Sequence, residues 1–333
     1  MRADPAAATA GVAVQVHEDV WPDGLDALAS LPQASFFQST AWWRALQQVL
    51  RCTPYVLAAR EGGQLQGACA FAAVRRFGLL RLYAGPLGTY GGILARSESV
   101  ATALGLALRS LSQERRVALV RLHDFTGRTL AALQGAPGWH ASGESCQVLD
   151  LAEEPQSLFE HSFTSQNRNK IRKAERAGLT VRRGADAAFL DAYAALYRTA
   201  LPRWRLRRPL PPALFAALVG APGVDVWLAE RDGTPVAALL NLRGGGQIMN
   251  WGNVSRPEAW RDAPNNLLHW RALEAACLDR QGPRLYNFGA SAGLPGVHAF
   301  KAAFGAREHA MVRLEYRAPW LAWVAPFRRR GRA

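Results

Sequence analysis

The order of strand-like and helix-like segments constrains the fold of this chain most, because the same order occurs twice. Each half contains a strand, two helices, three consecutive strands, a helix, a strand, another helix and a last strand. No sequence identity links the two halves, so the repeat, with a period of about 150 residues, is one of pattern only. The expected strands of the second half are 179–183, 224–231, 235–243, 247–253, 284–288 and 307–316.

Consecutive strands joined by short turns and followed by crossover helices predict a mixed sheet. Hairpin turns are indicated at Gly62-Gly63 and at Asp232-Gly233. Ser39 is a good N-cap for a helix that runs to about Leu50. We therefore predict an α/β (α+β) chain with two similar domains in tandem, each a mixed, mostly antiparallel twisted sheet flanked by helices. The predicted segments are a disordered tail 1–11, domains 12–151 and 152–318, and an aromatic and basic tail 319–333.

The charge balance favours an anionic partner. The chain of 333 residues has 40 basic and 26 acidic residues, a net charge of +14 and an isoelectric point near 10.6. Nucleic acid, nucleotide phosphates and acidic membrane surfaces are the partner classes that such a charge attracts.

The cysteine and histidine spacings argue against a disulfide scaffold and against a metal site. Four widely spaced cysteines show no CxxC, and seven histidines show no paired ligand spacing. We predict no metal and a reducing, cytoplasmic location. The N-terminal 1–11 segment lacks an apolar signal-peptide core. The chain contains no run of 18 or more apolar residues, so we predict no membrane span.

The segment 282–305 reads as a strand, a turn of small residues and a short helix that ends at Gly305. Such a segment delivers side chains just past the end of a strand, where open α/β sheets usually build their sites. Only three of the basic residues are Lys, namely Lys170, Lys173 and Lys301. Because the pKa of Lys moves readily whereas Arg stays charged, these positions are candidate sites.

The segment 168–183 is strongly basic, with Glu175 as its one acidic residue. On a helix, Arg168, Arg172 and Arg176 share one face, and like charges at that spacing repel each other. We expect an anion to lie against this face, or else a solvated basic surface, with Ile171 and Ala174 on the packed side.

Two further groups of cations are candidates for anion contact. Four Arg residues surround Trp204 in a loop bounded by prolines, which suits a nucleotide or a sugar phosphate and equally suits an exposed loop. The start of the helix at Asn265 offers backbone amides to an anion, with Arg256 and Arg261 close by.

Three motifs together resemble the FemAB-like transferases. They are the basic segment 165–181, the segment Asp262-Ala-Pro-Asn-Asn-Leu-Leu-His-Trp270, and Phe288-Gly289 followed by Phe300-Lys-Ala-Ala-Phe-Gly305. The resemblance covers about 159–305 and extends to the first half only in general layout. It implies two domains like those of GNAT acetyltransferases and transfer of an acyl or aminoacyl group to an amine.

The resemblance leaves the acyl donor open between acyl-CoA and an aminoacyl-tRNA. GNAT enzymes cradle the CoA pyrophosphate in a Gly-rich turn of the type [RQ]xxGx[GA], whereas segment 254–265 of this chain contains no Gly. The acceptor implied is a small molecule or glycan precursor of the cell envelope. The alternatives are an aminoacyl-tRNA-dependent enzyme of the peptidoglycan type and a non-catalytic RNA- or membrane-binding protein on the same scaffold.

Amide formation requires an amine that loses a proton and an oxyanion that is stabilised. Lys301 can hold a donor phosphate or the oxyanion, and His298 can act as a base. The predicted catalytic residues are Lys301, His298 and Tyr286. The predicted substrate- or donor-binding residues are Arg168, Lys170, Arg172, Lys173, Arg205, Arg261, Asn265, Asn287 and Phe300.

The C-terminal segment 319–333 joins aromatic residues to four Arg. It can lie on an anionic membrane face, which would place the protein peripherally at the inner membrane. The alternative is that Trp320 and Trp323 pack on the sheet ahead of a basic tail, which Pro326 favours because it cuts a helix short.

Overall fold

The computed structural model describes residues 2–3, 11–151, 154–204 and 209–321. The chain divides into two compact units. Unit 1 contains Met1–Gln33, Phe37–Glu144 and Ala310–Ala333, and unit 2 contains Ala34–Phe36 and Ser145–His309.

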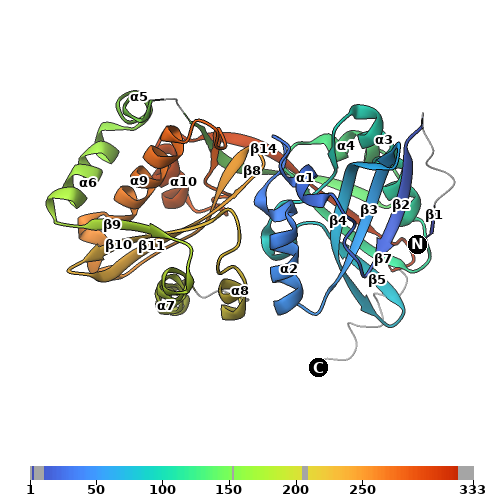
Figure 1. The fold of residues 1–333 in the computed structure, drawn as a ribbon, viewed down its shortest axis with the longest axis horizontal. Coiled ribbons are helices and arrows are strands. Elements are labelled where there is room, and N and C mark those ends of the chain that lie inside the picture. The colour runs from blue at the N-terminus through green and yellow to red at the C-terminus, as the bar shows by residue number, and fades with distance from the viewer. Residues whose placement is uncertain (1, 4–10, 152–153, 205–208, 322–333) are drawn as a thin grey trace. The chain divides into compact units, whose positions relative to one another are not determined.

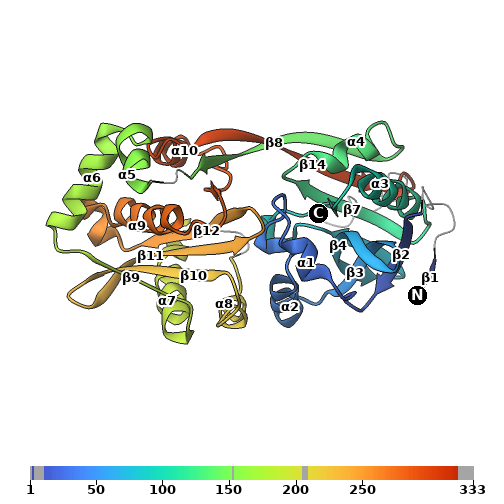
Figure 2. The same cartoon turned by 45° about the horizontal axis from the view of Figure 1, so that its top comes forward.

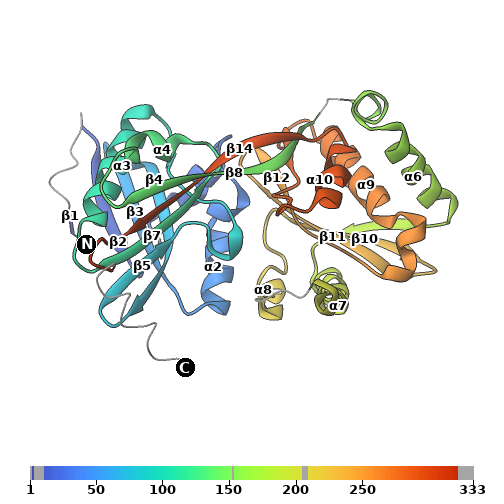
Figure 3. The same ribbon diagram turned by 180° about the vertical axis from the view of Figure 1, so that it is seen from behind.

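Unit 1 is built on a sheet in the order β1-β2-β3-β4-β5-β7-β14. The neighbouring strands of this sheet run antiparallel, except β5 and β7, which run parallel and can be followed side by side in Figure 3. Its strands are β1 (Arg2–Ala3), β2 (Ala13–Glu18), β3 (Thr53–Glu61), β4 (Gln64–Arg76), β5 (Leu79–Tyr83), β6 (Leu94–Ala95), β7 (Val117–Asp124) and β14 (Arg307–Arg317). Its helices are α1 (Leu25–Ala29), α2 (Thr40–Val49), α3 (Glu98–Ser112) and α4 (Arg128–Leu133).

Local sequence signals explain the helices of unit 1. The Ser39 side chain accepts a hydrogen bond from the Trp42 amide and caps α2, as predicted. Trp42 and Trp43 of this helix are buried. Helix α3 contacts β2, β3, β4 and β7 and covers the main apolar face of the sheet.

Unit 2 repeats this architecture in the order β8-β13-β12-β11-β10-β9. Figure 2 shows β9 to β12 side by side, and Figure 1 shows α7 and α9 on opposite faces of these strands. Its strands are β8 (Trp139–Asp150), β9 (Thr180–Gly184), β10 (Val224–Arg231), β11 (Thr234–Gly244), β12 (Gln247–Ser255) and β13 (Leu285–Asn287). Its helices are α5 (Pro155–Ser157), α6 (Ser165–Arg176), α7 (Ala187–Trp204), α8 (Pro212–Ala217), α9 (Pro264–Leu278) and α10 (Pro295–Ala302).

The predicted class is confirmed, since each unit has a mixed, mostly antiparallel sheet with flanking helices and one parallel pair. In both units a long helix, α3 or α9, connects the two parallel strands. Among the described residues, no helix is both long and apolar enough to cross a bilayer.

Two details differ from the sequence expectation. The helix expected to carry Arg168, Arg172 and Arg176 begins only at Ser165, because a π-helical turn at Leu158–Ser162 ends at buried Phe163 and Thr164 caps a new helix, α6. The strand expected to close the second half, β14, pairs with β7 of unit 1 from Val312 to Arg317. An alternating pattern identifies a strand but not its partner, so this pairing lay outside what the pattern predicts.

Gly252 allows α7 to approach β12. A Cβ atom at this position would lie 1.8 Å from the Tyr193 hydroxyl oxygen of α7. We predict that Gly252→Ala lowers the free energy of unfolding by about 2 kcal/mol through this clash, as measured by urea denaturation.

Gly143→Ala is the matched control, because no atom lies within 4 Å of its added Cβ, and it should change stability by less than about 0.5 kcal/mol. Adding Tyr193→Phe to Gly252→Ala should recover part of the loss. Equal losses in both Gly variants would contradict the close approach.

Candidate active site

The parallel strands of unit 2 separate shortly after they meet. β12 and β13 pair only from Gln247 to Met249 and from Leu285 to Asn287. β12 then continues to Ser255, and in the described chain residues 252–255 have no strand partner on the β13 side. An extended ligand can pair with such an unpaired strand edge.

Polar side chains fix the turn that follows β13. The Asn287 Oδ1 atom accepts a hydrogen bond from the Gly289 amide at 2.8 Å, and its Nδ2 atom donates to Gln247 Oε1 at 2.9 Å. Ser291 Oγ donates to Gln147 Oε1 at 2.6 Å. Gly289 has a φ of 74°, and a Cβ there would lie 3.0 Å from Met249 Cε, so both backbone and space favour Gly.

The side chain of Lys301, on α10, holds this turn in place. Its side chain is buried, and its Nζ atom donates hydrogen bonds to the Gly289 carbonyl at 2.7 Å and the Ala290 carbonyl at 2.9 Å. Burial lowers the pKa of Lys301 to about 8. Its ammonium therefore ties α10 to the end of β13.

A chain of buried polar groups runs from β12 through α9 to β13 and β11. Asn253 Nδ2 lies 3.1 Å from His269 Nε2, and His269 Nδ1 lies 3.2 Å from the Tyr286 hydroxyl. The Tyr286 hydroxyl donates to Asn241 Oδ1 at 3.1 Å. We call these four residues, Asn241, Asn253, His269 and Tyr286, the buried relay.

The buried relay holds its histidine neutral. Burial lowers the pKa of His269 to about 3, with a smaller contribution from the charge of Lys301. Burial also raises the pKa of Tyr286. A neutral imidazole with its proton on Nδ1 satisfies every contact, because Nε2 then accepts from Asn253 and Tyr286 donates to Asn241. The Asn253 carbonyl oxygen is buried with no hydrogen-bond partner among the described residues.

The start of α9 has few backbone N–H groups available to bind an anion. A 3-10 helix, Pro257–Asp262, occupies the place of a Gly-rich turn, Pro264 has no N–H, and the Asn266 amide donates to the Ala263 carbonyl. Asn265 Nδ2 donates to Ser255 Oγ at 3.2 Å, while its Oδ1 atom is buried without a partner in the described chain.

The predicted basic face on α6 is partly engaged within the protein. Arg168 donates to the backbone carbonyls of Glu160 and Phe163, and the Arg172 guanidinium lies over the Phe159 ring at 5.5 Å. Lys170 and Lys173 are exposed. Ile171 and Ala174 are fully buried, which confirms the predicted packed side.

The remaining predicted residues occupy three different settings. The His298 side chain is half exposed and its Nε2 lies 3.6 Å from Glu308 Oε1, although it shares α10 with buried Lys301. Phe300 packs on His269, with ring centroids 5.4 Å apart. Arg261 is 81% exposed. Arg205 lies outside the described residues.

The structure thus brings Tyr286, Asn287, Phe300 and Lys301 together around the end of β13, and places Asn265 at the start of the adjacent α9. Sequence reasoning missed His269 and Asn253. The signal available for His269 was a lone polar residue between Leu268 and Trp270 in an apolar helix.

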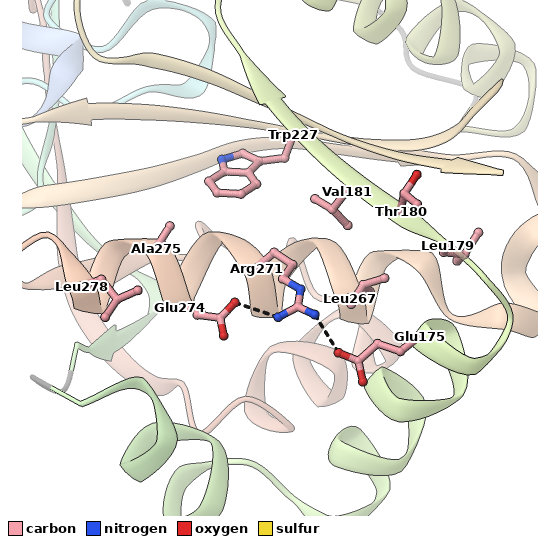
Figure 4. Close-up of a pocket in the computed structure, with 10 residues that line it drawn as sticks. All are labelled: Glu175, Leu179, Thr180, Val181, Trp227, Leu267, Arg271, Glu274, Ala275 and Leu278. Atoms are coloured by element: carbon pink, nitrogen blue, oxygen red, sulfur yellow. Dashed lines mark hydrogen bonds and ion pairs between the residues drawn. The ribbon is translucent and has the colours of Figure 1, made fainter. Parts of the chain in front are cut away.

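A separate cavity of about 630 Å³ lies between α6, α9, β9 and β10. Figure 4 shows Trp227 and Val181 facing α9, where Arg271 bridges Glu175 and Glu274 at 2.9 and 2.8 Å. Of the predicted catalytic and binding residues that the structure describes, none lines this cavity. Among the described residues, no group of three His, Cys, Asp or Glu side chains is arranged to hold a metal ion.

Comparisons with known proteins place this geometry in context. Residues 161–302 match the family model described as an acetyltransferase (GNAT) domain. No curated protein matches the chain in sequence.

Solved structures share the fold at low sequence identity. FemX is 14% identical with a TM-score of 0.73, covering 93% of this chain and 99% of FemX. A C-terminal domain assigned to a lysylphosphatidylglycerol synthetase from Agrobacterium fabrum is 13% identical with a TM-score of 0.62, covering 91% and 93%. A tandem GNAT protein from the clavulanic acid biosynthesis pathway is 15% identical with a TM-score of 0.51, covering 91% and 98%. The predicted tandem GNAT-like fold is confirmed.

We predict that Lys301→Ala destabilises the protein by about 2 kcal/mol in urea denaturation, because two carbonyls of the turn lose their donor. Lys170→Ala, at an exposed position of α6, should change stability by less than about 0.5 kcal/mol. Lys301→Met keeps the apolar stem, so wild-type stability in this variant would contradict the role of the ammonium in holding the turn.

Buried His269 should make the protein acid-sensitive. Its pKa is lower in the folded state, so below the ordinary value of 6.5 only the unfolded chain takes up this proton. The free energy of unfolding should therefore fall between about pH 6.5 and 5 by up to about 1.4 kcal/mol per pH unit.

The measurement is urea denaturation across this pH range with His269→Gln and, as control, His140→Gln at an exposed position. The slope should flatten in His269→Gln and persist in His140→Gln. An unchanged slope in His269→Gln would show that His269 is not held neutral.

Proposed function

We propose that this chain, of which residues 161–302 match the family model of an acetyltransferase (GNAT) domain, is an N-acyltransferase of the GNAT/FemAB type. It transfers an acyl group from a thioester or ester donor to an amine of a cell-envelope or polysaccharide precursor. The observation that carries the proposal is the separation of β12 from β13, which leaves residues 252–255 of β12 without a strand partner on the β13 side in the described chain, beside a polar turn fixed by hydrogen bonds.

The edge of β12 without a strand partner is suited to bind the extended, amide-containing part of the acyl donor, which we call the donor arm. Backbone N–H and C=O groups of β12 can pair with amide groups of such an arm, as in strand addition. A donor held in this way carries its reactive carbonyl toward the turn after β13, where Gly289 N–H is already used by Asn287. The protein then contributes mainly by placing donor and amine together, an effect that can be worth about 7–11 kcal/mol of barrier.

The side chains around β13 support positioning roles more than proton transfer. His269 is neutral and bonded on both ring nitrogens, and Tyr286 is fully buried with a raised pKa. We propose that Lys301 shapes the turn on which the tetrahedral intermediate forms. His298 is the titratable side chain of α10 that is open to solvent, and its role as a base stays a prediction.

A second candidate donor, an aminoacyl-tRNA, is favoured by the start of α9. The 3-10 helix and Pro264 remove amides that a CoA pyrophosphate uses in GNAT enzymes. The FemAB-like resemblance implies aminoacyl-tRNA in its peptidoglycan branch. The exposed Lys170 and Lys173 of α6 are available for the phosphates of such a donor.

The test is a donor screen with the full chain. Thermal shift with acetyl-CoA and an electrophoretic mobility shift with charged tRNA measure the two donor classes separately. We expect one class to bind and to transfer label to an amine acceptor. Binding of neither class would overturn the proposal and leave a non-catalytic RNA- or membrane-binding protein as the alternative.

Asn265→Asp tests donor contact at the start of α9. A carboxylate in the first turn favours the helix dipole, but it removes the Nδ2 donor to Ser255 and places charge at a buried oxygen position, so thermal unfolding is measured beside donor affinity. The same charge should weaken binding of an anionic donor by about tenfold or more through repulsion. Arg280→Ala, at an exposed position beyond the end of α9, is the control. Unchanged donor affinity in Asn265→Asp would place the donor phosphates elsewhere.

A further inference from the structure

Unit 1 contains a pair of parallel strands, β5 and β7, that corresponds to β12 and β13 of unit 2. In unit 1, however, the two strands do not separate. β5 and β7 pair from Leu80 to Tyr83, and the Ala84 amide extends the pairing by donating to the Arg121 carbonyl at 2.9 Å. Gly91 then bridges to His123 through two backbone hydrogen bonds. No strand edge is left open between β5 and β7 for a donor arm, so unit 1 needs a different explanation for its polar residues.

Those polar residues lie on one face of the β5–β7–β14 part of the sheet. Tyr83, Arg121 and Glu315 are direct neighbours across the three strands. Because side chains two residues apart on a strand share a face, Arg313 and Arg317 flank Glu315 on this same face. The apolar side chains of these strands, such as Leu82 and Leu314, belong to the other face, which α3 covers.

Glu315 gathers three guanidinium groups. It accepts hydrogen bonds from Arg121 Nε at 2.7 Å and Arg313 Nη2 at 3.0 Å, and a further one from Arg317 Nε. Burial alone would raise the pKa of Glu315, but the three hydrogen bonds outweigh it and lower the pKa to about 2. The carboxylate is therefore ionised throughout the physiological range and keeps the three Arg side chains in place.

The guanidiniums are accessible although the carboxylate is not. The exposed fractions of the side chains are 30% for Arg121, 35% for Arg313 and 64% for Arg317, against 12% for Glu315. Arg313 and Arg317 each use one nitrogen for Glu315, so further N–H donors of each planar fork remain available. The Arg121 guanidinium also lies 5.8 Å from the centroid of the Tyr83 ring.

The charge on this face does not cancel. Arg81 lies in the same row as Arg317, through Leu119, and brings the number of Arg residues to four. Glu315 and Glu144 oppose them, the latter at 3.1 Å from His123 Nδ1. With His123 counted as neutral, the described residues of this face contribute four positive and two negative charges, a surplus of two.

We propose that this arginine face, formed by Arg81, Tyr83, Arg121, Arg313 and Arg317 around Glu315, binds the diphosphate group of a small molecule. Planar guanidiniums bind phosphate oxygens bidentately, which is the recognition that a cluster of Arg rather than Lys provides. The face spans three strands, about 10 Å across, which matches a diphosphate and its first attached group more closely than a nucleic-acid duplex. The site is independent of the acyl-transfer proposal, because it lies in unit 1 and needs no donor.

The test is isothermal titration calorimetry of the full chain with inorganic diphosphate at low ionic strength. We expect saturable binding that weakens by about tenfold in Arg317→Ala and in Arg313→Ala. Arg44→Ala, at an exposed position of α2 in the same unit, should bind as the wild type does. Arg317→Lys keeps the positive charge but loses the planar guanidinium that binds two phosphate oxygens at once, so it should also weaken binding. Circular dichroism and thermal unfolding show that each variant is folded.

The outcomes separate the arginine face from a purely structural ion cluster. Absence of binding up to millimolar diphosphate, or equal affinity of Arg317→Ala, Arg313→Ala and Arg44→Ala, would overturn the proposal. A short single-stranded RNA is titrated in parallel. RNA binding that depends on Arg313 and Arg317, without diphosphate binding, would likewise overturn it in favour of a nucleic-acid surface.

Discussion

The separation of β12 from β13 is the constraint on which the rest of unit 2 depends. Two parallel strands in a sheet normally remain paired, so a pair that opens after three residues must be held open. Asn287 and Lys301 do this from the β13 side by occupying the backbone groups of the turn at Gly289. His269 and Tyr286 hold the two strands apart from the buried side, because their hydrogen bonds connect β12, α9, β13 and β11. Hydrogen bonds therefore fix both sides of the open edge.

The two units share one architecture but differ at their pair of parallel strands. The strand order and the parallel pair are the same, yet in unit 1 the loop after β5 returns and Gly91 pairs with His123. Closing the pair in this way removes the edge on which a donor arm could lie. What unit 1 keeps is a half-exposed sheet face on which Glu315 arranges Arg121, Arg313 and Arg317. A division between donor handling in unit 2 and anion recognition in unit 1 is consistent with both geometries.

The sequence predicted the features that depend on local pattern. The order of elements, the Ser39 cap and the buried side of α6 follow from periodicity and from capping chemistry. The pairing of β14 with β7 does not, because strand alternation carries no information on the partner. The buried relay was equally hidden, since His269, Asn253 and Tyr286 come from segments whose meeting requires the complete sheet. Segment 282–305 stood out in the sequence, but its Lys301 contacts the turn of the same segment, a detail only coordinates reveal.

The energetic cost of the buried relay is concentrated at the open edge of β12. Inside the relay, Asn241, His269 and Tyr286 offset their burial by bonding one another, and a neutral His269 avoids a buried charge. Asn253, at the end of the chain of contacts, leaves its carbonyl oxygen without a partner in the described part of the protein. A buried acceptor without a hydrogen bond costs about 1–3 kcal/mol. A water molecule or an N–H group of a substrate would remove this cost, and Asn253 lies on the stretch of β12 that has no strand partner on the β13 side. The unsatisfied carbonyl oxygen of Asn253 and the edge of β12 without a strand partner therefore lie on the same stretch of chain.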